Sequence, residues 1–111
     1  MYSIDEDNNI TLTRGDSFYA TVSIKDKDTG EEYIPVEGDK VRFALKRRYG
    51  DKQPLILKDI PIDTLLLYIE PVDTKPLSFD DYCYDIELTT SEGDVDTFIW
   101  EKRFTIAKEV Y

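Results

Sequence analysis

Residues 81–106 decide the fold, and they read DYCYDIELTTSEGDVDTFIWEKRFTI. In the first half of this stretch, large apolar side chains at Tyr82, Tyr84, Ile86 and Leu88 alternate with acidic or small ones. A turn-forming Ser-Glu-Gly-Asp follows, and a second alternating run comes after it. Alternation with a period of two places one set of side chains in a core and the other in water, so the stretch predicts a β-hairpin. The inward set of the second run is Phe98, Trp100, Phe104 and Ile106.

Shorter apolar or alternating runs elsewhere predict further strands, and no window shows the helical period of 3.6 residues. The predicted strands cover residues 10–13, 18–24, 33–36, 40–47, 55–57 and 64–70. Pro35 limits the run at 33–36 to an edge or irregular strand. Glu101-Lys102 interrupts the polarity of the last strand, where we expect a bulge. The connection over 72–80 contains a proline and has room for one helical turn.

The chain has 111 residues, which is enough for one domain with its own hydrophobic core. We expect residues 1–9 to be an acidic lead-in and residues 10–111 to form a single all-β domain. A count of about seven short strands at this spacing predicts a β-sandwich of antiparallel strands.

Catalytic chemistry finds little support in the sequence. The absence of histidine excludes cysteine–histidine and serine–histidine catalytic pairs within this chain. Cys83, the single cysteine, cannot form an internal disulfide, and the carboxylates of Asp81 and Asp85 would raise the pKa of its thiol. Residues 26–32 place acids before a glycine as a calcium loop does, but a hairpin turn explains them better because the glycine is one position too early. We therefore expect no enzymatic activity, no metal and no other cofactor.

The net charge of −10, from 24 acidic and 14 basic residues, is unevenly distributed. Residues 40–58 hold half of the basic residues and a single acid, so their net charge is +6 and that of the rest is −16. Val41, Phe43 and Leu45 take the inward parity of the basic strand, which turns its cations toward solvent or a partner. These cations are Lys40, Arg42, Lys46 and Arg48.

Three interpretations of this basic surface stay open. The acidic side of the strand at 81–88, with Asp81, Asp85 and Glu87, could lie beside the basic strand and pair opposite charges within one sheet. The two surfaces could instead meet between molecules, as in a head-to-tail ring or a layered assembly. Nucleic-acid binding fits least well, because the overall negative charge repels a phosphate backbone.

Most aromatic residues take inward parity, but we expect Tyr33, Tyr49 and Tyr111 to be exposed. Exposed tyrosines can stack on sugar rings or anchor a protein interface. A carbohydrate-binding or adhesin module is therefore the alternative function to consider.

The first residues, MYSIDED, are acidic and polar and lack the basic and apolar regions of a secretory signal. No apolar run approaches the roughly 20 residues that a membrane span needs. We expect no secretory signal, no membrane span and no membrane partner.

Several segments of the sequence resemble a known family. They are ITLTRGD at 10–16 followed by Phe18, VRF at 41–43, YCYDIEL at 82–88 and FTI at 104–106. In this order they resemble the N-terminal immunoglobulin-like domain of upper baseplate proteins from tailed phages of Gram-positive bacteria. The resemblance spans nearly the whole chain, from Ile10 to Val110.

This resemblance implies an immunoglobulin-like β-sandwich and offers no catalytic residues to carry over. It also implies a structural or adaptor role in a phage or prophage tail or baseplate. The partners would be other virion or tail proteins, with a homo-oligomer as one form of assembly. Such a protein would occupy the bacterial cytoplasm during assembly and the virion tail afterwards.

Overall fold

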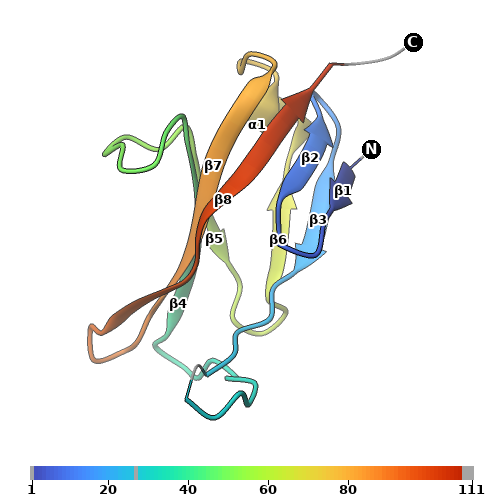
Figure 1. The fold of residues 1–111 in the computed structure, drawn as a ribbon. Coiled ribbons are helices and arrows are strands. Elements are labelled where there is room, and N and C mark those ends of the chain that lie inside the picture. Colours follow the sequence, from blue (N-terminus) through green and yellow to red (C-terminus); the bar gives the residue numbers. More distant parts are fainter. Residues whose placement is uncertain (1, 27, 109–111) are drawn as a thin grey trace.

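The computed structural model describes residues 2–26 and 28–108, apart from the side chain of Trp100. Its elements are β1 (Tyr2–Ile4), β2 (Ile10–Thr13), β3 (Phe18–Thr21), β4 (Lys40–Lys46), β5 (Ile56–Ile60), β6 (Leu66–Ile69), α1 (Pro71–Thr74), β7 (Asp80–Thr89) and β8 (Val95–Ala107). Six strands form a curled sheet in the order β1-β2-β8-β7-β4-β5, and the other two pair as β3-β6 (Figure 1). The all-β class predicted from the sequence is confirmed. The described helix, α1, has four residues, far fewer than the roughly 20 that cross a bilayer.

The core is built from the inward parities that the sequence predicts. On β4 the side chains of Val41, Phe43 and Leu45 are buried, while Lys40 and Arg42 are exposed. The alternate residues Tyr82, Tyr84, Ile86 and Leu88 of β7 are buried in the same way.

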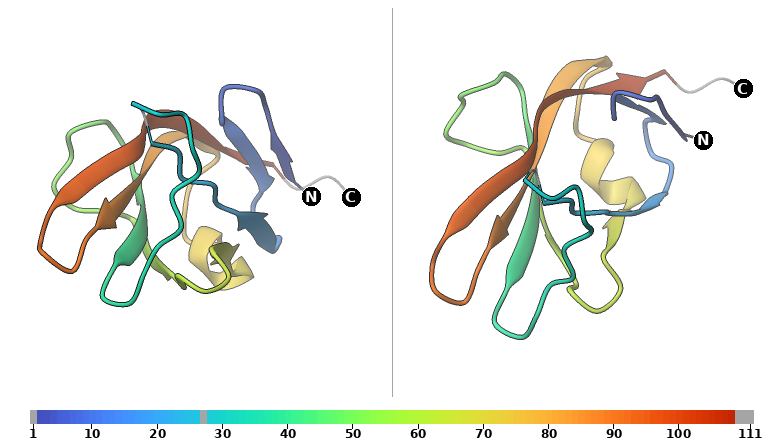
Figure 2. Two further views of the ribbon diagram at one scale, coloured as in Figure 1. Left: turned by 90° about the horizontal axis from the view of Figure 1, so that it is seen from below. Right: turned by 60° about the horizontal axis from the view of Figure 1, so that its bottom comes forward.

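Phe104 of β8 occupies the centre of an aromatic cluster that joins the two sheets. Its ring centroid lies 6.3 Å from that of Phe18, 6.2 Å from Phe43 and 6.1 Å from Tyr84. Phe18 belongs to the small sheet and the other three residues to the large one, so this cluster holds the two sheets together. The views of Figure 2 show the curl of the large sheet and the position of α1 beside the small one.

The sheet is mixed, and the prediction of antiparallel strands alone is wrong. β2 runs parallel to β8, with Ile10 opposite Phe104 and Thr13 opposite Ala107. Side-chain alternation predicts which face of a strand is buried, but it carries no information about the direction of the neighbouring strand.

Some predicted boundaries also differ from the structure. The acidic lead-in contributes strand β1, which pairs with β2 in antiparallel fashion. No regular strand forms at residues 33–36, because Pro35 lacks the N–H group that a strand ladder needs. Just before them, Lys25 and Glu32 form only an isolated β-bridge. β3 ends at Thr21, although its alternation continues into the buried side chains of Val22 and Ile24.

The bulge predicted at Glu101-Lys102 is confirmed. Tyr84 of β7 lies opposite Lys102, and Ile86 lies opposite Ile99, so β8 carries one extra residue between these two pairs. The backbone of Glu101 adopts a φ of 54°, in the left-handed region. Of the predicted inward set on β8, Phe104 and Ile106 are buried and Phe98 packs against the core. The Trp100 side chain lies outside what the structure describes.

The loop before β4 packs against the turn between β7 and β8. Gly38 has a φ of 95°, and a Cβ atom at this position would lie 2.7 Å from the Cβ of Ser91. The adjacent Asp39 is buried and accepts hydrogen bonds from the Tyr33 hydroxyl at 2.5 Å and from the Val36 amide at 3.1 Å. The Tyr33 hydrogen bond holds the pKa of the Asp39 carboxyl below its usual value.

Candidate protein-binding site

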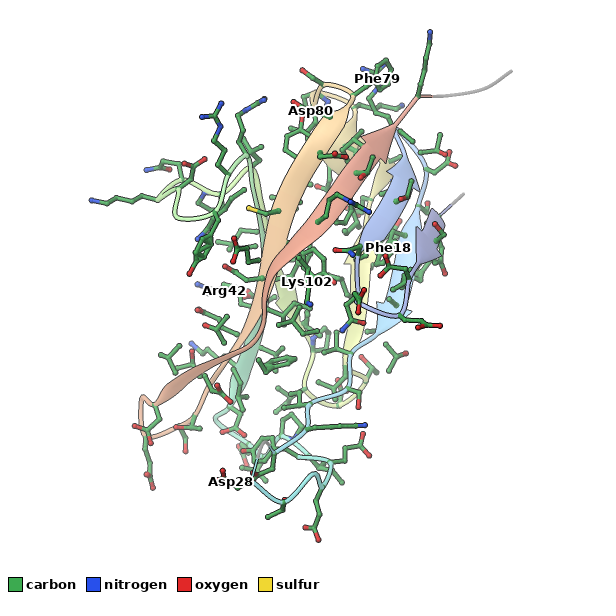
Figure 3. All side chains as sticks on the ribbon, in the orientation of Figure 1. Phe18, Asp28, Arg42, Phe79, Asp80 and Lys102 are labelled. Carbon is green, nitrogen blue, oxygen red and sulfur yellow. The ribbon has the colours of Figure 1, made fainter. Side chains whose placement is uncertain are left out.

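The predicted basic and acidic surfaces occupy one face of one sheet. β4 and β7 are antiparallel neighbours in which Arg42 lies opposite Glu87 and Ala44 lies opposite Asp85. Figure 3 shows Arg42 on the side of the large sheet that faces away from β3. Opposite charges therefore lie beside one another within a single molecule. This is the arrangement of the first interpretation, an internal ladder of opposite charges across neighbouring strands of one sheet.

Two ion pairs cross the strands of this face. The Lys46 Nζ lies 3.9 Å from the Asp85 Oδ2, and the Arg42 Nε lies 3.2 Å from the Asp59 Oδ1 on β5. Such pairs at the protein surface stabilise a fold by about 0–1 kcal/mol each. The side chains of Lys46 and Asp85 are partly buried, at 25% and 29% exposed. Asp81 is engaged differently, since its Oδ1 accepts a hydrogen bond from the Thr105 hydroxyl at 2.6 Å.

Three of the four predicted cations are on β4. Lys40, Arg42 and Lys46 are on β4, with Lys40 at its first position, opposite Thr89. β4 ends at Lys46, so Arg48 falls in the following turn, where its backbone N–H donates to the Asp51 carboxylate at 3.1 Å. Strand parity therefore orients three of the four cations, and it does not extend to Arg48.

Of the three tyrosines expected to be exposed, the two that the structure describes differ from one another. Tyr49 is 60% exposed and borders a hollow of about 460 Å³ that Lys46 and Asp85 also line. Tyr33 packs against the core, because its hydroxyl donates to the buried Asp39, and the prediction that it is exposed is wrong. Tyr111 lies outside the described residues.

Cys83 has the environment expected of an unreactive thiol. It is half-buried on β7, and its Sγ contacts the backbone oxygen of Lys46 at 3.7 Å. Burial, followed by the charge of Asp85, raises the pKa of the thiol. A raised pKa lowers the fraction of reactive thiolate at neutral pH.

Asp26 and residues 28–30 belong to a turn, as the sequence predicts, and the Gly30 N–H donates to the Asp26 backbone oxygen at 2.8 Å. The carboxylate of Asp26 accepts hydrogen bonds from the backbone of Asp28 at 2.8 Å and of Thr29 at 3.4 Å, and Gly30 has a φ of 73°. Asp26 thus satisfies the amides of its own turn. Across residues 2–26 and 28–108, no cluster of three or more His, Cys, Asp or Glu side chains could hold a metal ion.

A groove between the two sheets was not predicted from the sequence. It is a cavity of about 520 Å³ whose walls come from the β1–β2 hairpin, from β3 with its continuation, and from the bulged part of β8. Its lining includes Ile4, Asn8, Thr21, Ser23, Phe98 and Ile99.

The floor of the groove is apolar, with Leu67, Tyr84 and Ile86. The hydroxyl of Tyr84 donates to the backbone oxygen of Asn8, and burial, together with the charge of Asp5, raises the pKa of Tyr84 to about 12. Alternation marks these floor residues as inward-facing but does not reveal that the space above them is unfilled.

The outer face of the small sheet carries an aromatic pair. The rings of Tyr19 and Tyr68 are stacked, with centroids 4.5 Å apart and planes at 8°. Tyr2 covers the edge of β3 beside this pair: its hydroxyl donates to the backbone oxygen of Tyr19 at 2.9 Å, and its ring centroid lies 4.7 Å from that of the buried Phe18. The sequence signal was the outward parity of Tyr19 and Tyr68 on their two strands, but only the pairing of β3 with β6 brings them together.

An ion-pair network closes the opposite corner between the sheets. The ammonium group of Lys58, on β5, lies 2.8 Å from the Asp73 carboxylate and 3.6 Å from that of Glu70. Burial alone would lower the pKa of Lys58, but the hydrogen bond and charge of Asp73, with the help of Glu70, raise it above its usual value. The groove side has no such ionic closure among the described ion pairs.

Comparisons of the chain with known protein families, with characterised proteins and with solved structures find no match.

Proposed function

We propose that this chain is a non-enzymatic structural or adaptor domain of a phage or prophage tail or baseplate. In this proposal it acts through contacts with other virion or tail proteins. The observation that carries the binding role is the apolar groove between the two sheets, lined on one side by β3 and its continuation and on the other by β8. Groove-shaped apolar surfaces with a few polar groups are typical of binding sites.

The immunoglobulin-like sandwich is part of the same proposal. The order β8-β7-β4-β5 follows the G-F-C-C′ order of immunoglobulin variable-type sheets, and the β3–β6 pair follows the B–E pair of the facing sheet. Tyr82, near the start of β7, donates its hydroxyl to the backbone oxygen of Ser78 at 2.9 Å. This contact has the form of the tyrosine corner found at the E–F connection of immunoglobulin domains.

The perturbed titrating groups favour a binding role over a catalytic one. Strongly shifted pKa values often mark catalytic sites. Here Tyr84, whose pKa is raised to about 12, lies in the groove lining and donates its hydroxyl to the backbone oxygen of Asn8. The shifted carboxyl of Asp39 serves the loop before β4, and the shifted ammonium of Lys58 ties β5 to α1. All three groups are engaged in contacts that hold the fold together.

The tail or baseplate assignment rests on the sequence segments at 10–16, 41–43, 82–88 and 104–106. In the structure these segments supply parts of β2, β4, β7 and β8. These are the four inner strands of the large sheet, which has β1 and β5 at its edges. The resemblance therefore concerns the part of the chain that determines the architecture. Cytoplasmic assembly followed by residence in the virion tail belongs to the same proposal.

The test is the composition of purified tail particles from a bacterial strain that carries the gene within an induced prophage. Quantitative mass spectrometry should find the chain at a fixed ratio to the tail-tube protein, and immunogold labelling should place it at one end of the tail. A chain that stays in the soluble host fraction while intact tails lack it would refute the proposal.

A carbohydrate-binding or adhesin module remains the second candidate, because Tyr49 is 60% exposed beside a hollow. A glycan array should then give binding that is lost in Tyr49→Ala. A blank array with the wild-type protein would count against this candidate.

A further inference from the structure

One edge of the small sheet presents unpaired backbone groups. The Val22 amide donates to the Leu65 oxygen at 2.8 Å, on the side of β6, whereas the Tyr19 oxygen on the other side accepts the Tyr2 hydroxyl. Successive residues of a strand direct their backbone groups to opposite edges. The N–H and C=O groups of Thr21, the last residue of β3, therefore point to the edge away from β6. Val22 and Ile24 are buried and Ser23 between them is exposed, so the alternation continues and gives Ser23 the same orientation as Thr21. In the described part of the chain, no strand pairs with this edge.

The groove lies directly beside this edge. Thr21 and Ser23 line it from the side of the small sheet, and Phe98 and Ile99 line it from β8. β2 covers β8 only from Phe104 to Ala107. One more strand placed along the groove would continue the course of β2 and cover the gap between the two sheets.

We propose that the groove binds an extended segment of a partner protein, which adds a third strand to the β3–β6 sheet. The inference deepens the proposed function, on which it rests for the nature of the partner. The segment forms backbone hydrogen bonds with Thr21 and Ser23, and its alternate side chains enter the cavity of about 520 Å³. A third strand also suits the energetics, because two-stranded sheets are only marginally stable by themselves.

The charged side chains near the groove indicate which kind of partner segment it binds. Lys25 lines the groove. Lys102 lies opposite Tyr84 and so belongs to the inward-facing side of β8, as Figure 3 shows. The segment therefore combines apolar residues at alternate positions with at least one carboxylate.

The test uses a displayed library of random ten-residue peptides, selected on the immobilised full chain. Thr21→Pro removes the N–H group at the open edge, and proline is tolerated at strand positions whose N–H faces solvent. Thr21→Val keeps that N–H group and serves as the matched control. Lys25→Glu reverses a charge in the groove. The circular-dichroism spectra of all three variants establish that the fold is retained before binding is measured.

We expect enriched peptides with alternating apolar residues and a carboxylate. Their affinity should fall by about tenfold or more in Thr21→Pro and in Lys25→Glu and stay within about twofold in Thr21→Val, since a lost hydrogen bond or charge contact of 1.4 kcal/mol is a factor of ten. Peptides that bind wild type and Thr21→Pro equally would overturn the proposal. So would the absence of any enrichment, or binding of an apolar dye in the groove that no enriched peptide displaces. The presence of the chain in tail particles is measured separately. The tail or baseplate role and the binding of a partner strand in the groove can therefore each fail without the other.

Discussion

Reversal of one charge on the outer face of the large sheet separates the internal ladder from an intermolecular interface. Lys46→Glu replaces the ammonium that lies 3.9 Å from the Asp85 carboxylate with a second carboxylate. The loss of such a surface pair costs about 0.2–1 kcal/mol, and like charges across neighbouring strands add a penalty of similar size. The expected loss of stability is therefore about 0.5–2 kcal/mol.

The corresponding change in Tm follows from the size of the chain. An unfolding entropy of about 2.1 cal/mol/K per residue makes each kcal/mol worth about 4 °C for a domain of 111 residues. Lys46→Glu should thus lower Tm by about 2–8 °C. The combined variant Lys46→Glu/Asp85→Lys restores an attractive pair and should recover most of that loss. Added salt should shrink the differences, because it screens exposed charges.

The assay is thermal unfolding followed by circular dichroism, with light scattering on the same samples. Lys40→Glu is the control, since Lys40 lies opposite the neutral Thr89 and its reversal should change Tm less. A double variant that is no more stable than Lys46→Glu would refute the internal pairing. Assembly of the wild type that disappears in Arg42→Glu/Lys46→Glu with Tm unchanged would favour the intermolecular interface instead.

Three further predictions concern the core, a close approach and pH. Phe104→Ala should cost about 3–5 kcal/mol in chemical denaturation, against less than about 0.5 kcal/mol for the exposed Val95→Ala, and similar losses for both would contradict the aromatic cluster. Gly38→Ala should destabilise the fold more than Gly50→Ala, because both positions have a positive φ but only Gly38 lacks space for a methyl group. Equal losses of stability in the two variants would contradict the close contact between Gly38 and Ser91. Tyr84 has a folded-state pKa of about 12, above the usual 10, so its contribution to stability is complete below pH 10 and is lost as pH rises toward 12. Tyr84→Phe should flatten that part of the stability profile, and an unchanged slope would contradict the shift.

The inward and outward faces of most strands could be predicted from the sequence, because burial follows a period of two. Val41, Phe43 and Leu45 are examples, as is the bulge, which Glu101 reveals by interrupting the alternation. The helical turn allowed for in the connection after β6 is present as α1, which begins one residue earlier, at Pro71. Proline suits the first turn of a helix because its missing N–H would have no partner there.

Other features depend on contacts between segments that are distant in the sequence. Tyr33 is drawn inward by a hydrogen bond to Asp39, which hydropathy does not signal. The parallel run of β2 beside Phe104 is set by how the two sheets are connected. The groove exists because the edges of β3 and β8 stay apart before β2 begins at Ile10. No local pattern at Thr21 or Ser23 distinguishes an open edge from a paired one.

Amide hydrogen exchange of the free protein, read residue by residue by NMR, tests the open edge most directly. If the edge is open, amide exchange rates should alternate from residue to residue along β3 and its continuation. The Val22 amide, bonded to Leu65, should exchange slowly, while those of Thr21 and Ser23 on either side should exchange orders of magnitude faster. Slow exchange at all three positions would show that the edge of β3 is already occupied and would contradict the account.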